Sequence, residues 1–255
     1  MKILVCGKGG SGKSTFSVML ARAFDAMGWL VLLVDADESN FGIPNLIGVS
    51  APLDLMESLG GKKGFKEKMN ANFPADGGGI FDKKQAISDL DPECVASAGK
   101  IHVVTIGKIH HFGEGCACPM GILSRKFLSS LSVGENEVVI VDTEAGVEHF
   151  GRRVIEEADV ILGVVDPTAE SFRLAEKMRN MAADAQKRIY FVLNKTEHDI
   201  ESYMSASLPQ ELVAAKIPKD NEMFMASLQG RPITSTGKEV QQLAAMLSQA
   251  AQPEF

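Results

Sequence analysis

The sequence predicts an α/β fold with a doubly wound, mainly parallel sheet that is flanked by helices. Short apolar runs rich in Val, Ile and Leu recur along the chain, and helical patterns or long loops separate them. Such uninterrupted runs are typical of parallel strands that are buried on both faces. The 255 residues, 45% of them hydrophobic, are enough for one sizeable core, so we expect a single domain over residues 1–255.

The apolar runs set the expected strands, which cover residues 2–6, 30–34, 101–106, 138–142, 160–165, 189–193 and 213–217. Apolar residues at helical spacing predict helices over residues 16–27, 169–186 and 237–251, and Gly28 is an end signal for the first of them. Residues 60–84 mix glycine, lysine and scattered aromatic residues. We interpret this stretch as a solvated, insertion-like loop, with a partner-binding element as the alternative.

Charge and composition argue against several classes of function. A net charge of −7 gives no basic footprint for nucleic acid or for an anionic membrane. The longest apolar stretches are strand-sized, and the first ten residues run from a strand into a glycine loop, unlike a signal peptide. We therefore expect a cytoplasmic protein with reduced thiols, no nucleic-acid partner and no stable membrane association.

The strongest motif is Gly-Lys-Gly-Gly-Ser-Gly-Lys-Ser-Thr at residues 7–15, between the first expected strand and the first helix. This is the context that the P-loop pattern GxxxxGK[ST] requires. Glycines let the backbone amides surround a phosphate chain, and the helix N-terminus adds its positive dipole. We expect Lys13 to contact the β- and γ-phosphates and the Ser14 hydroxyl to bind Mg²⁺. The predicted nucleotide-binding residues of the loop are Gly7, Gly9, Gly10, Ser11, Gly12, Lys13, Ser14 and Thr15.

Aspartates stand at the ends of two expected strands, at the sheet edge where α/β proteins bind ligands. Asp35 and Asp37 follow the second strand, and Asp142 ends the fourth. Asp142 fits the carboxylate that holds the magnesium shell, and the Gly146 amide is placed to sense the γ-phosphate. A buried aspartate at a strand end can be only a helix cap, but three of them beside a P-loop favour a catalytic site.

Lys8 adds a second lysine to the loop, in the pattern KGGxGKS. With it the chain resembles the class that contains the MinD septum-positioning ATPases, the ParA partitioning ATPases and the nitrogenase iron protein. The resemblance implies an enzyme that hydrolyses ATP to ADP and phosphate with Mg²⁺. It also implies a homodimer in which Lys8 contacts the partner subunit's nucleotide, much as an arginine finger acts in trans.

This resemblance covers nearly the whole chain. It assigns DADESN to a first switch, in which Asp37 positions the attacking water, and DTEAG to a second switch that begins at Asp142. It also assigns Asn194 to the segment that reads the base, and Ile217 and Pro218 to a segment that flanks adenine.

The residues NKTE at 194–197 leave the base open between adenine and guanine. They also resemble the NKxD pattern of GTPases, in which the aspartate grips guanine. Glu197 stands in that place here, and its longer side chain fits guanine poorly. The family likeness favours adenine.

Within this class the chain is most similar to the CooC-type ATPases, which insert nickel during the maturation of carbon monoxide dehydrogenase. The residues that carry this resemblance are Gly-Cys-Ala-Cys-Pro at 115–119 and DADESNFGIPNLIGV at 35–49. A proline is typical after the second switch aspartate, and Glu38 stands there in this chain. The resemblance implies a client metalloenzyme similar to carbon monoxide dehydrogenase.

Cys116 and Cys118 are candidate ligands for Zn²⁺ or Ni²⁺, because thiolates two residues apart in a turn can share one such ion. One chain supplies two sulfurs, so a two-fold dimer would complete a four-sulfur site. A redox-active disulfide and two inert thiols are the alternatives. With structural or redox-active cysteines, the alternative function is a MinD- or ParA-type switch for protein or DNA positioning.

The other cysteines and two histidines give weaker signals. Cys6 lies on the first expected strand and Cys94 in an expected helix, and both are interpreted as small apolar residues. His110 and His111 precede the cysteine pair and could serve as outer ligands, although surface histidines are common in loops.

Overall fold

The computed structural model describes residues 1–71, 81, 83–109, 118–147 and 153–250. Its centre is an eight-stranded sheet in the order β3-β4-β2-β5-β1-β6-β7-β8. All neighbouring strands are parallel except β3 and β4, which confirms the predicted fold class. The strands are β1 (Lys2–Gly7), β2 (Leu30–Ala36), β3 (Ala96–Ala98), β4 (Ile101–Thr105), β5 (Glu137–Thr143), β6 (Val160–Val165), β7 (Arg188–Thr196) and β8 (Val213–Pro218).

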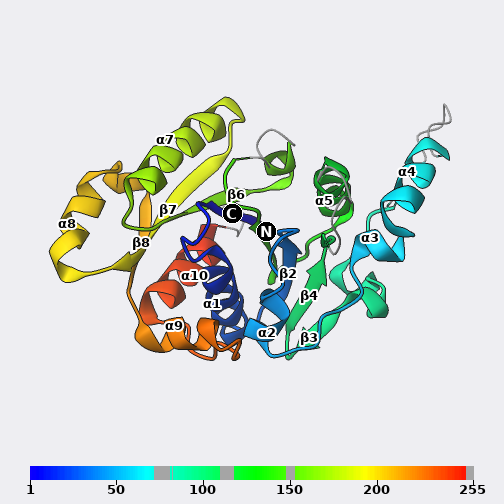
Figure 1. Ribbon diagram of the computed structural model, residues 1–255, viewed down its shortest axis with the longest axis horizontal. Coiled ribbons are helices and arrows are strands. Elements are labelled where there is room, and N and C mark those ends of the chain that lie inside the picture. The colour runs from blue at the N-terminus through cyan, green and yellow to red at the C-terminus, as the bar shows by residue number, and fades with distance from the viewer. Residues whose placement is uncertain (72–80, 82, 110–117, 148–152, 251–255) are drawn as a thin grey trace.

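Helices cover both faces of this sheet (Figure 1). The α-helices are α1 (Lys13–Ala26), α2 (Ile43–Ile47), α3 (Leu55–Ser58), α4 (Gly61–Ala71), α5 (Cys118–Ser130), α7 (Ala169–Asp184), α8 (His198–Ala206), α9 (Asn221–Leu228) and α10 (Lys238–Ala250). Short 3₁₀ helices cover Ile87–Asp89, Pro92–Cys94, Val154–Glu157 and Gln210–Leu212. Within the described ranges, no helix is both long enough and apolar enough to span a membrane.

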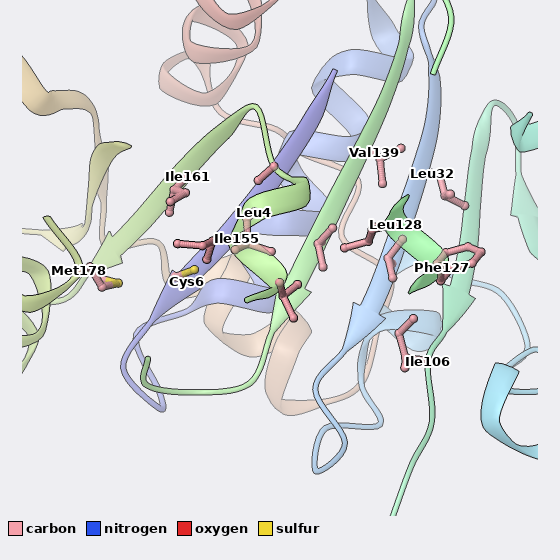
Figure 2. Close-up of a cluster of buried hydrophobic side chains, with 14 of the residues drawn as sticks. Leu4, Cys6, Leu32, Ile106, Phe127, Leu128, Val139, Ile155, Ile161 and Met178 are labelled. Carbon is pink, nitrogen blue, oxygen red and sulfur yellow. The ribbon is translucent and has the colours of Figure 1, made fainter. Parts of the chain in front are cut away.

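The core lies in two layers, one on each face of the sheet. Successive side chains of a strand point to opposite faces, so Ile3 and Val5 pack toward α1 and α10. Leu4 and Cys6 point the other way, toward α5 and α7 (Figure 2). Figure 2 shows Cys6 among apolar side chains, and burial raises the pKa of its thiol to about 12, in agreement with its interpretation as a small apolar residue. Cys94 is also buried, at the end of a 3₁₀ helix.

All seven expected strands are present, but two local predictions differ from the structure. The edge strand β3 was not expected, because its sequence Ala-Ser-Ala contains no apolar run. The interpretation of residues 60–84 as a solvated loop is wrong for Gly61–Ala71, which forms helix α4. Phe65 and Met69 are four residues apart, so they share one face of α4 and pack against the core on the α5 side. Residues 72–80 and 82 of this stretch lie outside the described residues.

Candidate nucleotide site

The P-loop lies between β1 and α1, at the carboxyl edge of the sheet, as the sequence predicted. Helix α1 begins at Lys13, three residues earlier than expected, so Lys13, Ser14 and Thr15 form its first turn. Gly12 has a φ of +96°, and a Cβ there would lie 2.4 Å from the Asn194 side-chain nitrogen. Only glycine combines this backbone conformation with such a close approach.

The end of β7 holds the P-loop in place through two side chains. The Asn194 amide donates to the Ser11 carbonyl at 2.7 Å, and the Lys195 ammonium donates to the Gly10 carbonyl at 2.6 Å. Asn194 therefore bonds the phosphate loop in this structure, and its role in reading the base stays a prediction. The second base candidate, Pro218, lies at the end of the neighbouring strand β8 and pairs in register with Thr196.

The two predicted magnesium ligands lie side by side. The Ser14 hydroxyl donates to the Asp142 carboxylate at 2.7 Å, and the Ser17 hydroxyl donates to its other oxygen at 2.9 Å. Ser14 and Ser17 are three residues apart on α1 and so face the same strand end. The Asn40 amide donates to the Ser14 hydroxyl at 2.8 Å. These hard oxygen donors suit Mg²⁺, so Ser14 and Asp142 are a fitting pair for it.

Burial of Asp142 leads to a stability prediction. Burial raises the pKa of Asp142 from 3.8 to about 6, while hydrogen bonds from Ser14 and Ser17 oppose the rise. Between these pH values the folded protein binds more protons than the unfolded chain, so its stability falls as the pH rises through about 6. The shift corresponds to about 2–3 kcal/mol of unfolding free energy. We therefore expect Asp142→Asn to stabilise the protein at pH 8 when Mg²⁺ and nucleotide are absent.

Urea unfolding of wild type and Asp142→Asn in EDTA, at pH 8 and pH 4.5, measures this effect. Acidic groups far from Asp142 titrate alike in both proteins, so their contributions cancel in the difference. The charge of Asp142 also raises the pKa of Asp35, so its removal lowers that pKa and adds to the advantage of the variant at pH 8. The advantage of the variant should shrink on acidification. An advantage of equal size at both pH values would contradict the explanation by buried charge.

The first switch carries the two other predicted aspartates, and they have different surroundings. Asp35 is fully buried and forms an ion pair with Lys108, whose ammonium lies 2.7 Å from its carboxylate. Burial raises the pKa of Asp35 to about 7, and Lys108 opposes the rise. Asp37 is also buried, and one of its carboxylate oxygens accepts from the Ser39 N–H at 3.0 Å and from the Ser39 hydroxyl at 2.7 Å. Glu38, which stands where a proline is typical of the CooC-type ATPases, is buried as well.

The two lysines of the P-loop point to different partners. Lys13 is buried, and its ammonium lies 3.4 Å from the Lys8 carbonyl oxygen. The Lys8 ammonium lies 3.3 Å from the carboxylate of Asp166, which follows β6, and 27% of the Lys8 side chain is exposed. The Gly146 N–H, which was predicted to sense the γ-phosphate, donates to the Gly7 carbonyl at 3.1 Å. A contact between this amide and a phosphate requires the bond to Gly7 to open.

The cysteine pair is only partly described. Cys118 is the first residue of α5 and is exposed, whereas Cys116, His110 and His111 lie outside the described residues. Among the residues that the structure describes, no group of three or more His, Cys, Asp and Glu side chains could hold a metal ion. The predicted metal site at Cys116 and Cys118 therefore stays a prediction.

Sequence reasoning missed Lys108, Lys195, Asn40, Ser17 and Asp166. Asp166 had a usable signal, since it directly follows an expected strand, and Asp142 is the last residue of another. Ser17 had another, because it lies one helical turn after Ser14. For Lys108 and Lys195, the contacts depend on which strands are neighbours in the sheet, and no local pattern gives that order.

Comparison with known proteins places this site among nucleotide-binding proteins. Residues 2–233 match the CobQ/CobB/MinD/ParA nucleotide binding domain. An uncharacterised ATP-binding protein of Methanocaldococcus jannaschii is 40% identical over 97% of this chain and 100% of its own length. The carbon monoxide dehydrogenase accessory protein CooC of Rhodospirillum rubrum is 33% identical over 90% of this chain and 88% of its own length. The fold is similar to that of MinD from Pyrococcus horikoshii, solved with Mg-ADP, with a TM-score of 0.68 at 18% identity over 98% of this chain and 96% of that chain.

Proposed function

Because this chain belongs to the CobQ/CobB/MinD/ParA family of P-loop nucleotide-binding proteins, we propose that it is a Mg²⁺-dependent ATPase that delivers a metal ion to a client enzyme. ATP enters the P-loop, and the products are ADP and phosphate. The nucleotide-bound form is a homodimer that binds Zn²⁺ or Ni²⁺ through Cys116 and Cys118. The client resembles carbon monoxide dehydrogenase, in keeping with the likeness to CooC.

The observation that carries the ATPase is the meeting of Ser14 and Asp142 beside Lys13. Lys13 contacts the β- and γ-phosphates, and Ser14 and Asp142 hold Mg²⁺, which neutralises phosphate charge when it is bound. Asp37 accepts a hydrogen bond from the attacking water and so orients it toward the γ-phosphate. Lys8 exchanges its ion pair with Asp166 for the phosphates of the partner subunit, which completes the second active site.

The link from the nucleotide to the cysteines runs through helix α5. Cys118 begins this helix, and Met120, Gly121 and Ser124 in its first two turns line a small cavity. Residues of both switches also line this cavity, namely Ala36, Glu38, Thr143 and Glu144. A movement of either switch would change the space beside the first turns of α5, which supports coupling between nucleotide state and metal affinity.

Mass spectrometry under native conditions, with added ZnCl₂ or NiCl₂ and an ATP analogue, tests this function. We expect one ion for every two chains in the wild type. Cys116→Ala and Cys118→Ala should each lose the ion and still bind nucleotide, since two thiolates per dimer cannot close a four-sulfur site. Cys94→Ala is the matched control, because it removes a thiol from the buried core. It should keep the ion.

In the same experiment, Lys8→Ala tests whether dimerisation can be lost while nucleotide binding is kept. This variant should bind the ATP analogue and stay monomeric. One ion per monomer in the wild type would reject the shared site. Unchanged metal content in the Cys116→Ala/Cys118→Ala variant, together with a normal ATP-dependent dimer, would favour a MinD- or ParA-type positioning switch instead.

A further inference from the structure

The side chain of Lys108 is enclosed by the first switch. Lys108 follows β4 closely, and only 7% of its side chain is exposed. Its ammonium donates to the Asp35 carboxylate at 2.7 Å, to the Asp37 carbonyl at 2.6 Å, and to the Asn40 carbonyl. The Phe41 ring lies beside it, with its centroid 5.5 Å from the ammonium nitrogen. An ammonium has three hydrogens, so the first switch occupies all of them.

Two of these three bonds end on backbone carbonyls, so they fix the path of the switch itself. The backbone adds to this, because the Ile106 N–H donates to the Asp35 carbonyl at 2.9 Å and the Ile109 N–H donates to the Glu38 carbonyl at 3.1 Å. These backbone bonds hold positions 35 and 38. Lys108 holds the positions between and beyond them, 37 and 40.

The position of Asp37 therefore depends on Lys108. Hydrogen bonds from Ser39 fix the orientation of the Asp37 carboxylate, and the backbone carbonyl of Asp37 accepts from the Lys108 ammonium. The side-chain amide of Asn40 donates to the Ser14 hydroxyl, and the backbone carbonyl of Asn40 accepts from the Lys108 ammonium. One lysine thus bonds the backbone of two residues near the phosphate site. The Asn40 side chain bonds Ser14, and the charge of Asp37 raises the pKa of Asp142. The hydrogen bonds of Lys108 end on the switch and not on the P-loop.

We propose that Lys108 is a positioning residue for ATP hydrolysis, which holds the first switch so that Asp37 faces the attacking water. This rests on the proposed function, in which Asp37 orients that water. A loss of Lys108 should lower kcat and leave nucleotide affinity nearly unchanged, because the P-loop keeps its own contacts. A misplacement of about 1 Å in such a group can lower a rate on the order of 10²-fold.

The test must separate positioning from simple loss of stability. Lys108→Met alone leaves the Asp35 carboxylate buried without its cation, which destabilises the fold. The double variant Asp35→Asn/Lys108→Met removes both charges and should fold, yet it lacks the ties to the carbonyls of Asp37 and Asn40. Lys100→Met is the matched control, since the Lys100 ammonium also binds a backbone carbonyl, that of Gly28, but at the other end of β4.

The measurements are kcat and KM for ATP, the Kd for an ATP analogue, and thermal unfolding. We expect the double variant to fold, to bind the analogue within about 3-fold of wild type, and to turn over on the order of 10²-fold more slowly. Asp35→Asn alone should be much faster than the double variant, and Lys100→Met should match wild type.

Two results would overturn the proposal. One is a folded double variant with the kcat of the wild type or of Asp35→Asn. The other is a loss of analogue affinity that accounts for the whole loss of activity. If Asp37→Asn itself turns over normally, the failure lies in the assignment of Asp37 under the proposed function and not in Lys108.

Discussion

Lys13→Ala is expected to hydrolyse ATP on the order of 10³-fold more slowly than the wild type. Lys13 is buried in the first turn of α1, beside the carboxylate of Asp142, so its charge acts in a site with little water. Charge develops on the phosphate oxygens during transfer, and a fixed cation in such a site stabilises it strongly. The variant should also bind ATP more weakly, because the phosphates lose their principal cation.

Phosphate release under saturating ATP measures the rate, and titration with a fluorescent ATP analogue measures binding. Lys100→Ala is the control, because it removes an exposed lysine that bonds the Gly28 carbonyl. It should change neither quantity. Normal turnover by Lys13→Ala would show that the P-loop is not part of the active site.

Asp37→Asn is expected to bind ATP and to dimerise, but to turn over on the order of 10²-fold more slowly. Asparagine keeps the oxygen that accepts from Ser39, so the switch should keep its shape. What it loses is the second carboxylate oxygen, which accepts a hydrogen bond from water, because an NH₂ donor replaces it. Because ATP is consumed slowly, the variant should accumulate as the ATP-bound dimer.

Single-turnover hydrolysis and size-exclusion chromatography with ATP give the two readouts. Asp91→Asn is a matched control, since the Asp91 carboxylate likewise accepts from a backbone N–H two residues later, at 3.0 Å, but lies before the edge strand β3. It should behave as wild type. A variant at position 37 that hydrolyses ATP at the normal rate would show that another group orients the water.

The fold could be predicted because each buried parallel strand is a visible apolar run. What failed was the assignment of segments whose apolar residues are few. In α4, Phe65 and Met69 alone mark the buried face, and glycines and lysines around them hide the helical pattern. In β3, pairing with β4 along three residues supplies the structure, while its side chains carry almost no signal.

In the candidate site, the meeting of Ser14 with Asp142 could be predicted from local motifs, since both stand at the carboxyl edge of a parallel sheet. The tie between Asp35 and Lys108 could not. It requires β2 and β4 to be neighbours, and an apolar run does not say which strand it will pair with. The same holds for Lys195 and the P-loop, which meet because β6 alone separates β1 from β7.

The sheet order also has a consequence for how the chain acquires its structure during synthesis. β1 is made first, but both of its neighbours come late, since Lys2 pairs in register with Val139 and Ile3 with Val160. β2 likewise waits for Ile101 and for residues of β5. A nascent chain therefore leaves the ribosome with two apolar strands that are not neighbours in the final sheet, and contacts so distant in sequence form slowly. The phosphate loop directly follows β1, yet the residues that bond it or the start of α1, namely Asp142, Asn194 and Lys195, are translated much later.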